Sequence, residues 1–191
     1  IAHGARIVCL GEMGIGNTTA SAALVSSLLP LDISLSIGRG TGVDDAGLAR
    51  KYAAVKKACA RKDAPLSSRA DPFATLCAVG GLEIAALCGV CLASAARRTP
   101  VLVDGYIASS AALCAARLAP EVMPYLFFAH CSAESGHRHL LSLLDTRPLL
   151  DCNLRLGEGT GAVLALSLMK AACAILTEMA TFDSAGVSKK I

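Results

Sequence analysis

The chain has 191 residues, enough for one domain with a substantial core and short for two. Apolar residues make up 54% of it, aromatic residues only 4%, and Trp is absent, so the apolar content consists mainly of small residues that let helices and sheets approach closely. The net charge of +3 is scattered, and with so few aromatic side chains to stack on bases, nucleic acid is not an expected partner.

A membrane span and a disulfide framework are not expected either. Residues 13–31 lack charge but include polar side chains and Pro30, and the apolar stretch between Glu83 and Arg97 is too short to cross a bilayer. The chain opens without the pattern of a signal peptide. Nine scattered cysteines, including the Cys88-Gly-Val-Cys91 pair, are typical of reduced, buried thiols. We therefore expect a cytoplasmic protein.

The first predicted unit is a strand, a glycine-rich loop and a helix. Residues 5–10 are expected to form a buried strand and residues 18–29 a helix that ends near Pro30. The loop between them reads GEMGIGNTT. Such a loop can bind a phosphate through its free N–H groups, or it can serve only as a tight turn that needs positive φ.

A second glycine-rich loop, SIGRGTGVDDAGLARK, leads into a helix predicted from Asp44 through Lys62. Its cations Arg39, Arg50 and Lys51 could close over a phosphorylated sugar, although an ordinary loop beside a solvated helix face explains them as well. Two further helices are expected at residues 71–78 and 81–96, separated at Gly80-Gly81.

The second half of the chain alternates between strands and helices. Strands are predicted at residues 101–108 and 125–130, helices follow each of them, and a helix of about 20 residues closes the folded part. This alternation predicts an α/β fold with a parallel, doubly wound (Rossmann-like) sheet and flanking helices. Ligands bind beyond the carboxyl ends of such strands, where this chain carries Glu12, Asp104, and His130 with Ser132.

Two other interpretations of the polar residues are less favoured. His130, His137 and His139 have no acidic or cysteine partner at a recognisable spacing, so no metal site is predicted. Ser132, His130 and Glu134 could form a nucleophilic triad, but the chain has no nucleophile elbow.

Residues 154–162 read LRLGEGTGA and place Glu158 between two glycines, just before an apolar helix. Glycine-rich turns ahead of helices usually bind phosphate, which a carboxylate would repel. Glu158 therefore either caps the helix or has a chemical role of its own.

Five segments together carry a family resemblance. CLGEMGIGNTTASAAL, GRGTGVDDAGLARK, VGGLEIAAL, PVLVDGYIASSAAL and LRLGEGTGAVLAL resemble the nicotinate-nucleotide–dimethylbenzimidazole phosphoribosyltransferase family, in order, from about residue 4 to residue 187. The resemblance implies transfer of phosphoribose from nicotinate mononucleotide to 5,6-dimethylbenzimidazole, which gives nicotinate and α-ribazole 5′-phosphate for the lower ligand of cobalamin. It implies no cofactor and no metal.

The resemblance also implies roles for particular residues. Glu158, in the LGEGTGA motif, would be the catalytic base, and the phosphate site would draw on Glu12, Gly14, Lys51 and Ser132. The rest of the expected substrate-binding set lies in the same motifs: Gly16, Asn17, Asp104, Leu156 and Gly157.

The family comparison sets expectations for the whole protein as well. Family chains begin well upstream of Ile1, so this chain is expected to hold a truncated phosphoribosyl-binding domain (residues 1–155) and the base loop with the C-terminal helix of a small helical domain (156–191). A bacterial cytoplasmic homodimer is implied. The alternative is a non-catalytic nucleotide- or phosphate-binding protein that lacks a complete acceptor pocket.

Overall fold

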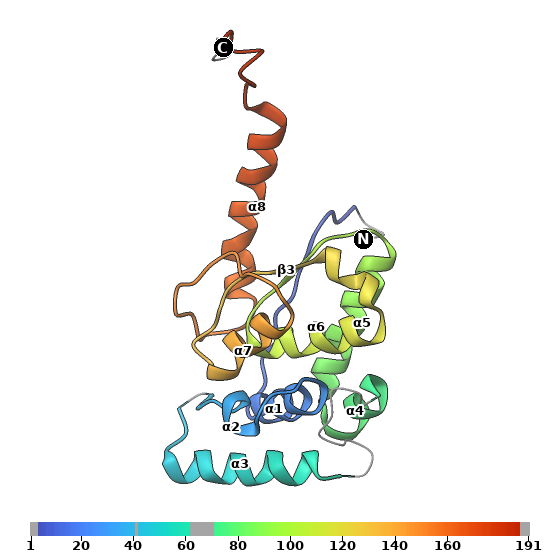
Figure 1. The fold of residues 1–191 in the computed structure, drawn as a ribbon, viewed down its shortest axis with the longest axis vertical. Helices are drawn as coiled ribbons and strands as arrows, with labels where there is room; N and C mark the ends of the chain where they lie inside the picture. The colour runs from blue at the N-terminus through green and yellow to red at the C-terminus, as the bar shows by residue number, and fades with distance from the viewer. Residues whose placement is uncertain (1–3, 41, 62–70, 188–191) are drawn as a thin grey trace.

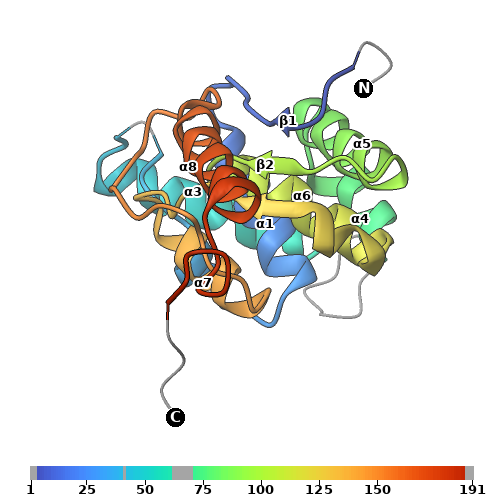
Figure 2. The same ribbon diagram turned by 90° about the horizontal axis from the view of Figure 1, so that it is seen from above.

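A computed structural model describes residues 4–40, 42–61 and 71–187. Within them, three parallel strands form one sheet in the order β1 (Val8–Cys9), β2 (Val101–Val103) and β3 (Leu126–Phe128). Helices cover both faces: α8 (Thr160–Glu178) lies on one, and α5 (Leu82–Ala96) and α6 (Tyr106–Leu118) lie on the other (Figure 1; Figure 2). The predicted parallel α/β fold is confirmed.

The remaining helices follow the predicted order, with two short additions. The helix predicted at residues 44–62 ends at Cys59, and Lys62 lies outside the described residues. Neither the four-residue helix α2 nor the 3-10 helix η1 was expected from the sequence pattern. The bounds are α1 (Asn17–Leu28), α2 (Ile33–Ser36), α3 (Asp45–Cys59), α4 (Pro72–Val79), η1 (Pro120–Tyr125) and α7 (Ser135–Leu143).

All three strands are shorter than predicted, and the difference is largest at residues 101–108. Strand β2 ends at Val103, and α6 already begins at Tyr106. Tyr106 has a high strand propensity, but its side chain is buried and its hydroxyl donates a hydrogen bond to the Ser36 carbonyl at 2.7 Å. This tertiary contact is compatible with a helix start, and the early start of α6 leaves Asp104 and Gly105 in the turn after β2.

The side chains of β2 alternate between the two faces of the sheet, with the two-residue period of a strand. Val101 and Val103 face the main core, whereas Leu102 faces the other way, against Ala162 and Ala165 of α8. Because every β2 residue is buried, the strand reads as a continuous apolar run, typical of parallel sheets covered on both faces.

Helix α1 is buried on several sides because it lies between α6 and α3 (Figure 1). Its small residues allow this close packing, and its buried serines find partners on neighbouring helices. Ser26 bonds to Ser36 at 2.7 Å, and Ser21 accepts from Ser110 at 3.1 Å. These bonds link α1 to α2 and to α6.

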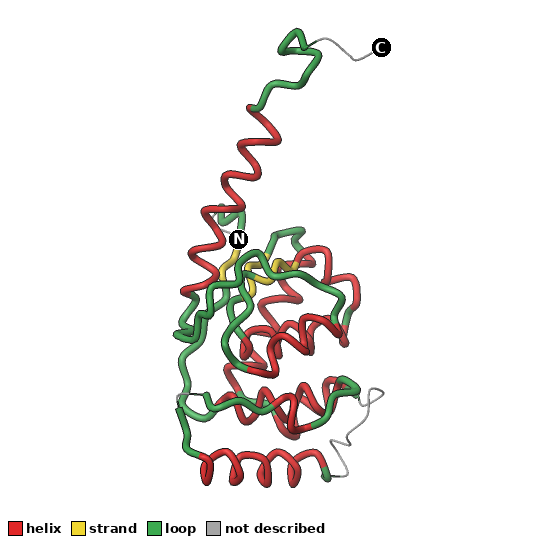
Figure 3. The backbone as a smooth tube through the Cα atoms, turned by 60° about the vertical axis from the view of Figure 1, so that its left-hand side comes forward, coloured by secondary structure: helices red, strands yellow, loops and turns green. Residues whose placement is uncertain are grey.

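Helix α8 extends away from the rest of the chain, with only its first turns packed on the sheet (Figure 3). Its buried residues are Gly161, Ala162 and Ala165. It is also the one helix among the described residues long and apolar enough to cross a membrane, with a mean hydropathy of 1.7. This is weak evidence for a span, because apolar helices of globular proteins meet the same criterion, and the first turn of α8 belongs to the site described next.

Candidate active site

A cavity of about 970 Å³ opens beyond the carboxyl ends of the three strands. It is bounded by the loops that follow β1, β2 and β3, by the start of α3, and by the segment before α8. This is where ligands bind in parallel α/β sheets. Its lining includes every residue predicted for the site: Glu12, Gly14, Gly16, Asn17, Lys51, Asp104, Ser132, Leu156, Gly157 and Glu158.

The loop after β1 brings Glu12 to the cavity and starts α1. Gly16 adopts φ 91° at the helix N-cap and supplies no side-chain cap, so the first turn of α1 lies at the cavity uncapped by a side chain, and the Thr19 N–H donates to the Gly16 carbonyl at 3.0 Å. Asn17 donates a hydrogen bond to Glu12. A Cβ on Gly14 would lie 2.8 Å from the Asn17 side-chain nitrogen, so a larger residue there would have to displace the Asn17 side chain. Burial raises the pKa of Glu12, and the hydrogen bond from Asn17 opposes this change.

Lys51 projects from α3 into the cavity and is almost completely buried. Its ammonium donates to the Thr18 hydroxyl and to the Gly38 carbonyl, both at 2.8 Å. A lysine ammonium has three protons, so one remains for a ligand. Burial lowers the pKa of Lys51, and the charge of Glu134 opposes that shift. Thr18 was not predicted, and only its position at the start of α1 could have suggested it.

The loop after β3 holds Ser132 against His137 rather than against His130. The backbone N–H of Ser132 donates to His137 Nδ1 at 2.9 Å, and the Ser132 hydroxyl lies 3.0 Å from the same atom. Because Nδ1 accepts, the ring proton sits on Nε2, which lies 2.9 Å from the Ser109 hydroxyl. Burial lowers the pKa of His137 to about 3, so the ring is neutral. The triad of Ser132, His130 and Glu134 is not formed.

The segment before α8 places Glu158 opposite the GEMGIGN loop. Gly157, Glu158 and Gly159 all adopt left-handed conformations, with φ 78°, 60° and 80°. The Glu158 N–H donates to the Glu12 carbonyl at 3.2 Å, and a Cβ on Gly11 would lie 2.6 Å from the Gly159 nitrogen. Two motifs that are distant in the sequence are thus in backbone contact. The Glu158 side chain is exposed and lines the cavity.

Asp104 lies against this segment, and the residue is 3% exposed. Its two oxygens accept hydrogen bonds from the backbone N–H groups of Gly159 and Ala162, each at 3.1 Å. His130 Nε2 lies 3.4 Å from Asp104 Oδ1. Burial alone would raise the pKa of Asp104, but His130 and the two N–H groups outweigh it and hold the pKa below its ordinary value.

The two ends of the cavity differ in chemistry. Helices α1 and α6 begin at the cavity with glycine N-caps that supply no side-chain cap, whereas α2, α3 and α4 are capped by aspartates. Helix N-termini and a buried ammonium suit an anion. Near Glu158, the exposed apolar side chains of Met13, Ile15 and Leu156 line the wall and suit a flat apolar ring.

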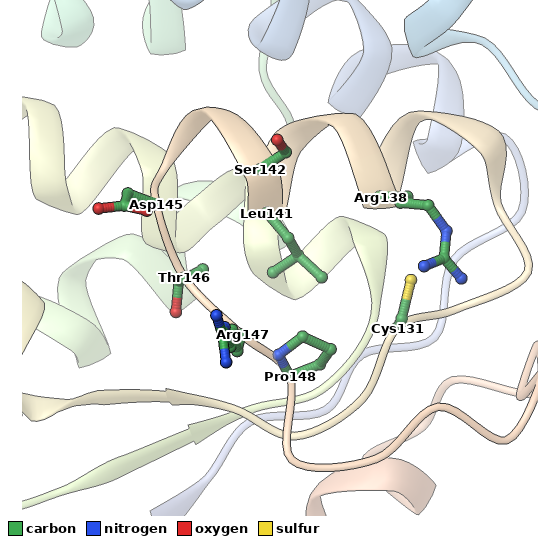
Figure 4. A pocket seen from close by; sticks show the side chains of 8 residues that line it. All are labelled: Cys131, Arg138, Leu141, Ser142, Asp145, Thr146, Arg147 and Pro148. Atoms are coloured by element: carbon green, nitrogen blue, oxygen red, sulfur yellow. The ribbon is translucent and has the colours of Figure 1, made fainter.

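A second pocket of about 320 Å³ is lined by Cys131, by residues of α7 and by the segment after α7 (Figure 4). Arg138 and Arg147 are its cations, and the Arg138 guanidinium donates a hydrogen bond to Asp151 at 3.0 Å. The Asp145 side chain points away from the pocket. None of the predicted site residues lines this pocket. In the described part of the chain, no three His, Cys, Asp or Glu side chains are grouped so as to bind a metal.

Comparison with known proteins shows the family of the chain. The family model DBI_PRT, described as a phosphoribosyltransferase, matches residues 1–187. Nicotinate-nucleotide–dimethylbenzimidazole phosphoribosyltransferases of Chloroflexus aurantiacus and Pseudomonas aeruginosa are 52% and 53% identical over 191 and 187 residues, which are 100% and 98% of this chain but 54% and 52% of theirs. The chain thus spans about half the length of these relatives.

Solved structures give the same result for the fold. The crystal structure of CobT from Thermus thermophilus superposes with a TM-score of 0.92 and 48% identity, over 99% of this chain and 55% of that one. A second structure, of the nicotinate-nucleotide–dimethylbenzimidazole phosphoribosyltransferase from the same organism, gives a TM-score of 0.89. By sequence and by structure, the chain belongs to this phosphoribosyltransferase family.

Proposed function

We propose that the complete protein transfers phosphoribose from nicotinate mononucleotide to 5,6-dimethylbenzimidazole, giving nicotinate and α-ribazole 5′-phosphate, with Glu158 as the general base. The observation that carries this proposal is the cavity that combines an anion-binding end at Lys51 with an apolar end at Glu158. The names of the relatives motivate the choice of substrates.

The phosphate of the donor fits the Lys51 end. The free proton of the ammonium and the uncapped first turn of α1 line the cavity, together with Ser132 and the residues that begin α6. Charge-assisted hydrogen bonds to a phosphate are about twice as strong as neutral ones. Anchoring the phosphate there would orient the ribose toward the opposite end of the cavity, and orientation supplies a large part of many rate enhancements.

The acceptor ring fits the Glu158 end. One nitrogen of the benzimidazole would attack the anomeric carbon with its lone pair, and the proton on the other nitrogen would become acidic as the bond forms. A carboxylate hydrogen-bonded to that N–H can take the proton, a contribution of about 10²–10⁴-fold. Glu12, whose pKa burial raises, lies beside Glu158 and is suited to hold the ring by hydrogen bonding.

The departing group needs no acid catalyst. Nicotinate is attached to the ribose as a cationic pyridinium and leaves as a neutral ring when the glycosidic bond breaks. Attack from the opposite face then inverts the anomeric carbon. The demands on the protein are thus orientation at Lys51 and proton removal at Glu158.

Replacing Glu158 by Gln in the full-length protein tests this proposal. We expect turnover to fall by at least about 10²-fold with little change in nicotinate mononucleotide affinity, because only the base is lost. Glu121→Gln, an exposed carboxylate in η1, is the matched control and should retain full activity. Nicotinate release measured by chromatography gives the rate, and wild-type turnover in Glu158→Gln would remove Glu158 from the base role.

The alternative function, phosphate or nucleotide binding without transfer, makes a different prediction in the same assay. Nicotinate mononucleotide would bind, as measured by calorimetry, and no nicotinate would be released by wild-type protein. The exposed apolar wall at Met13, Ile15 and Leu156 gives this alternative its support, because it leaves the acceptor end open to solvent.

We extend the proposal to three properties of the complete protein. We infer that residues 156–191 belong to a small helical domain, because the buried residues of α8 are confined to its first turns. The exposed apolar face of α8 suits burial in a larger assembly such as a homodimer. The bacterial relatives favour a cytoplasmic location.

A further inference from the structure

The Glu158 segment has a backbone that needs external support. Three successive residues, Gly157 to Gly159, adopt left-handed conformations, and the central one is not glycine. A left-handed non-glycine residue costs about 1–2 kcal/mol and persists only where its surroundings hold it. The helix that follows, α8, begins at Gly159 without a side-chain cap from its own sequence.

That support comes from Asp104, at the end of β2. One carboxylate oxygen accepts the Gly159 N–H and the other accepts the Ala162 N–H, both at 3.1 Å. Asp104 therefore does for α8 what an N-cap aspartate does for an ordinary helix, but from another part of the chain. The first N–H group belongs to the residue directly after Glu158, and the second belongs to a residue about one turn further along α8. Together the two bonds fix the position of the segment and its direction.

His130 completes the arrangement from the end of β3. Its Nε2 lies 3.4 Å from Asp104 Oδ1, and the ring is 2% exposed. Gly161 makes room for this contact: a Cβ there would lie 2.0 Å from His130 Cδ2 and 2.8 Å from Asp104 Oδ1. A side chain at position 161 would push the pair away from the helix start.

We propose that Asp104, oriented by His130, is a positioning residue that holds the Glu158 segment in its left-handed conformation, rather than a group that contacts substrate. The inference rests on the proposed function, because it assigns the orientation of the base to this pair. It replaces the substrate-binding role that the family motif implies for Asp104. The carboxylate is available for this role because its pKa lies below the ordinary value, so it remains an acceptor at neutral pH.

The test compares Asp104→Asn and Gly161→Ala with wild type in the full-length protein. The first replaces one accepting oxygen by an NH₂ group, and the second displaces the pair sterically. Gly89→Ala is the matched control, since a Cβ at Gly89 of α5 meets nothing within 4 Å. We expect both test variants to exchange the amide hydrogens of residues 159–162 at least about tenfold faster than wild type, and the control to be unchanged.

Kinetics then separate positioning from substrate contact. We expect kcat to fall by at least about tenfold in both variants, with the KM for nicotinate mononucleotide within about threefold of wild type. Adding Asp104→Asn to Glu158→Gln should lower kcat by less than about twofold, because the base that Asp104 positions is already gone. Glu158→Gln alone should leave the amide exchange unchanged.

The outcomes that overturn the proposal are distinct from failure of the proposed function. Wild-type amide exchange in Asp104→Asn would refute positioning. A double variant in which the reduction of kcat equals the product of the two single reductions would refute it as well. A rise in KM with unchanged exchange would return Asp104 to substrate binding. If wild type releases no nicotinate, the proposed function fails, but the exchange measurement still tests the support of residues 157–159. If Asp104→Asn does not fold, Gly161→Ala provides the same comparison.

Discussion

At the residue scale, Lys51 differs from every other lysine that α3 contributes. It is almost fully buried and shares its ammonium between Thr18 and Gly38, whereas Lys56 and Lys57 of the same helix are exposed. We expect Lys51→Ala to weaken binding of nicotinate mononucleotide by at least about tenfold, since a hydrogen bond to a charged group contributes about 1.5–3 kcal/mol. Calorimetry would measure the affinity, with Lys56→Ala as control. Equal affinities in the two variants would argue against a phosphate at Lys51.

His137 makes the stability of the chain depend on pH. Burial, aided by the charges of His130 and Arg138, lowers its pKa from 6.5 to about 3, so the ring takes up a proton mainly on unfolding. The unfolded state thus binds more protons between these values, and the free energy of unfolding should fall by about 1.4 kcal/mol for each pH unit below 6.5.

Urea denaturation at about pH 7, 6 and 5 would measure that slope. His137→Gln does not titrate at this position and should show a shallower slope, whatever its stability at neutral pH. Asp104 should not contribute to the slope in this pH range. Its pKa is lower in the folded chain than its ordinary value of 3.8, so its protonation destabilises the folded chain only below that value. An identical slope in both proteins would contradict a neutral, buried His137.

The sequence predicted which residues line the cavity better than it predicted their partners. Glu12, Lys51 and Glu158 follow from the family resemblance of the glycine-rich motifs that contain them, and all three line the cavity. The contact of Ser132 with His137 and the bonds from Asp104 to α8 do not, because they join residues that only the assembled sheet brings together. Neither periodicity nor motif spacing contains that information.

At the scale of elements, α4 contains a buried hydroxyl that contributes no hydrogen bond. Thr75 is fully buried, and its Oγ1 has no partner among the described residues. An unpaired buried hydroxyl carries a desolvation cost of about 1–3 kcal/mol. We expect Thr75→Val, which keeps the shape, to leave the free energy of unfolding unchanged or to raise it by up to about 1 kcal/mol.

Chemical denaturation would detect that change, and Thr75→Ser is its control. Serine keeps the hydroxyl and loses the methyl group, so it should be less stable than the wild type. A valine variant destabilised by more than about 1 kcal/mol would contradict an unpaired hydroxyl at this position.

The sequence pattern predicted one boundary between elements correctly and another one wrongly. The break between α4 and α5 was predicted, because Gly80-Gly81 interrupts two apolar runs. The strand predicted over residues 101–108 was too long, because Tyr106 and Ile107 have high strand propensity but occupy the first turn of α6. In the folded chain Tyr106 donates a hydrogen bond to Ser36, a tertiary contact that propensity does not include.

At the scale of the whole molecule, the apolar surface of α8 governs how the chain behaves in solution. Leu168, Ile175 and Leu176 are 46%, 57% and 86% exposed on a helix that contacts the sheet only through its first turns. Exposed apolar patches of this kind favour association. We expect the 191-residue chain to self-associate at micromolar concentrations, as measured by sedimentation velocity.

Leu168→Gln combined with Leu176→Gln should reduce that association and leave the unfolding temperature within about 2 °C of the wild-type value, because neither side chain is buried. Leu35→Gln, a half-exposed apolar residue of α2, is the control and should have no effect on association. Unchanged sedimentation in the double variant would place the association surface elsewhere.

The cavity is assembled from segments that extend from Glu12 to Glu158, nearly the whole length of the chain. Contacts between residues so far apart form only after the intervening chain has been ordered, since long loops must close before those contacts are made. The bonds from Asp104 to Gly159 and Ala162 are of this kind. The helices can therefore be present while the cavity is still incomplete, so we expect the cavity to be among the last features formed during folding and among the first lost on warming.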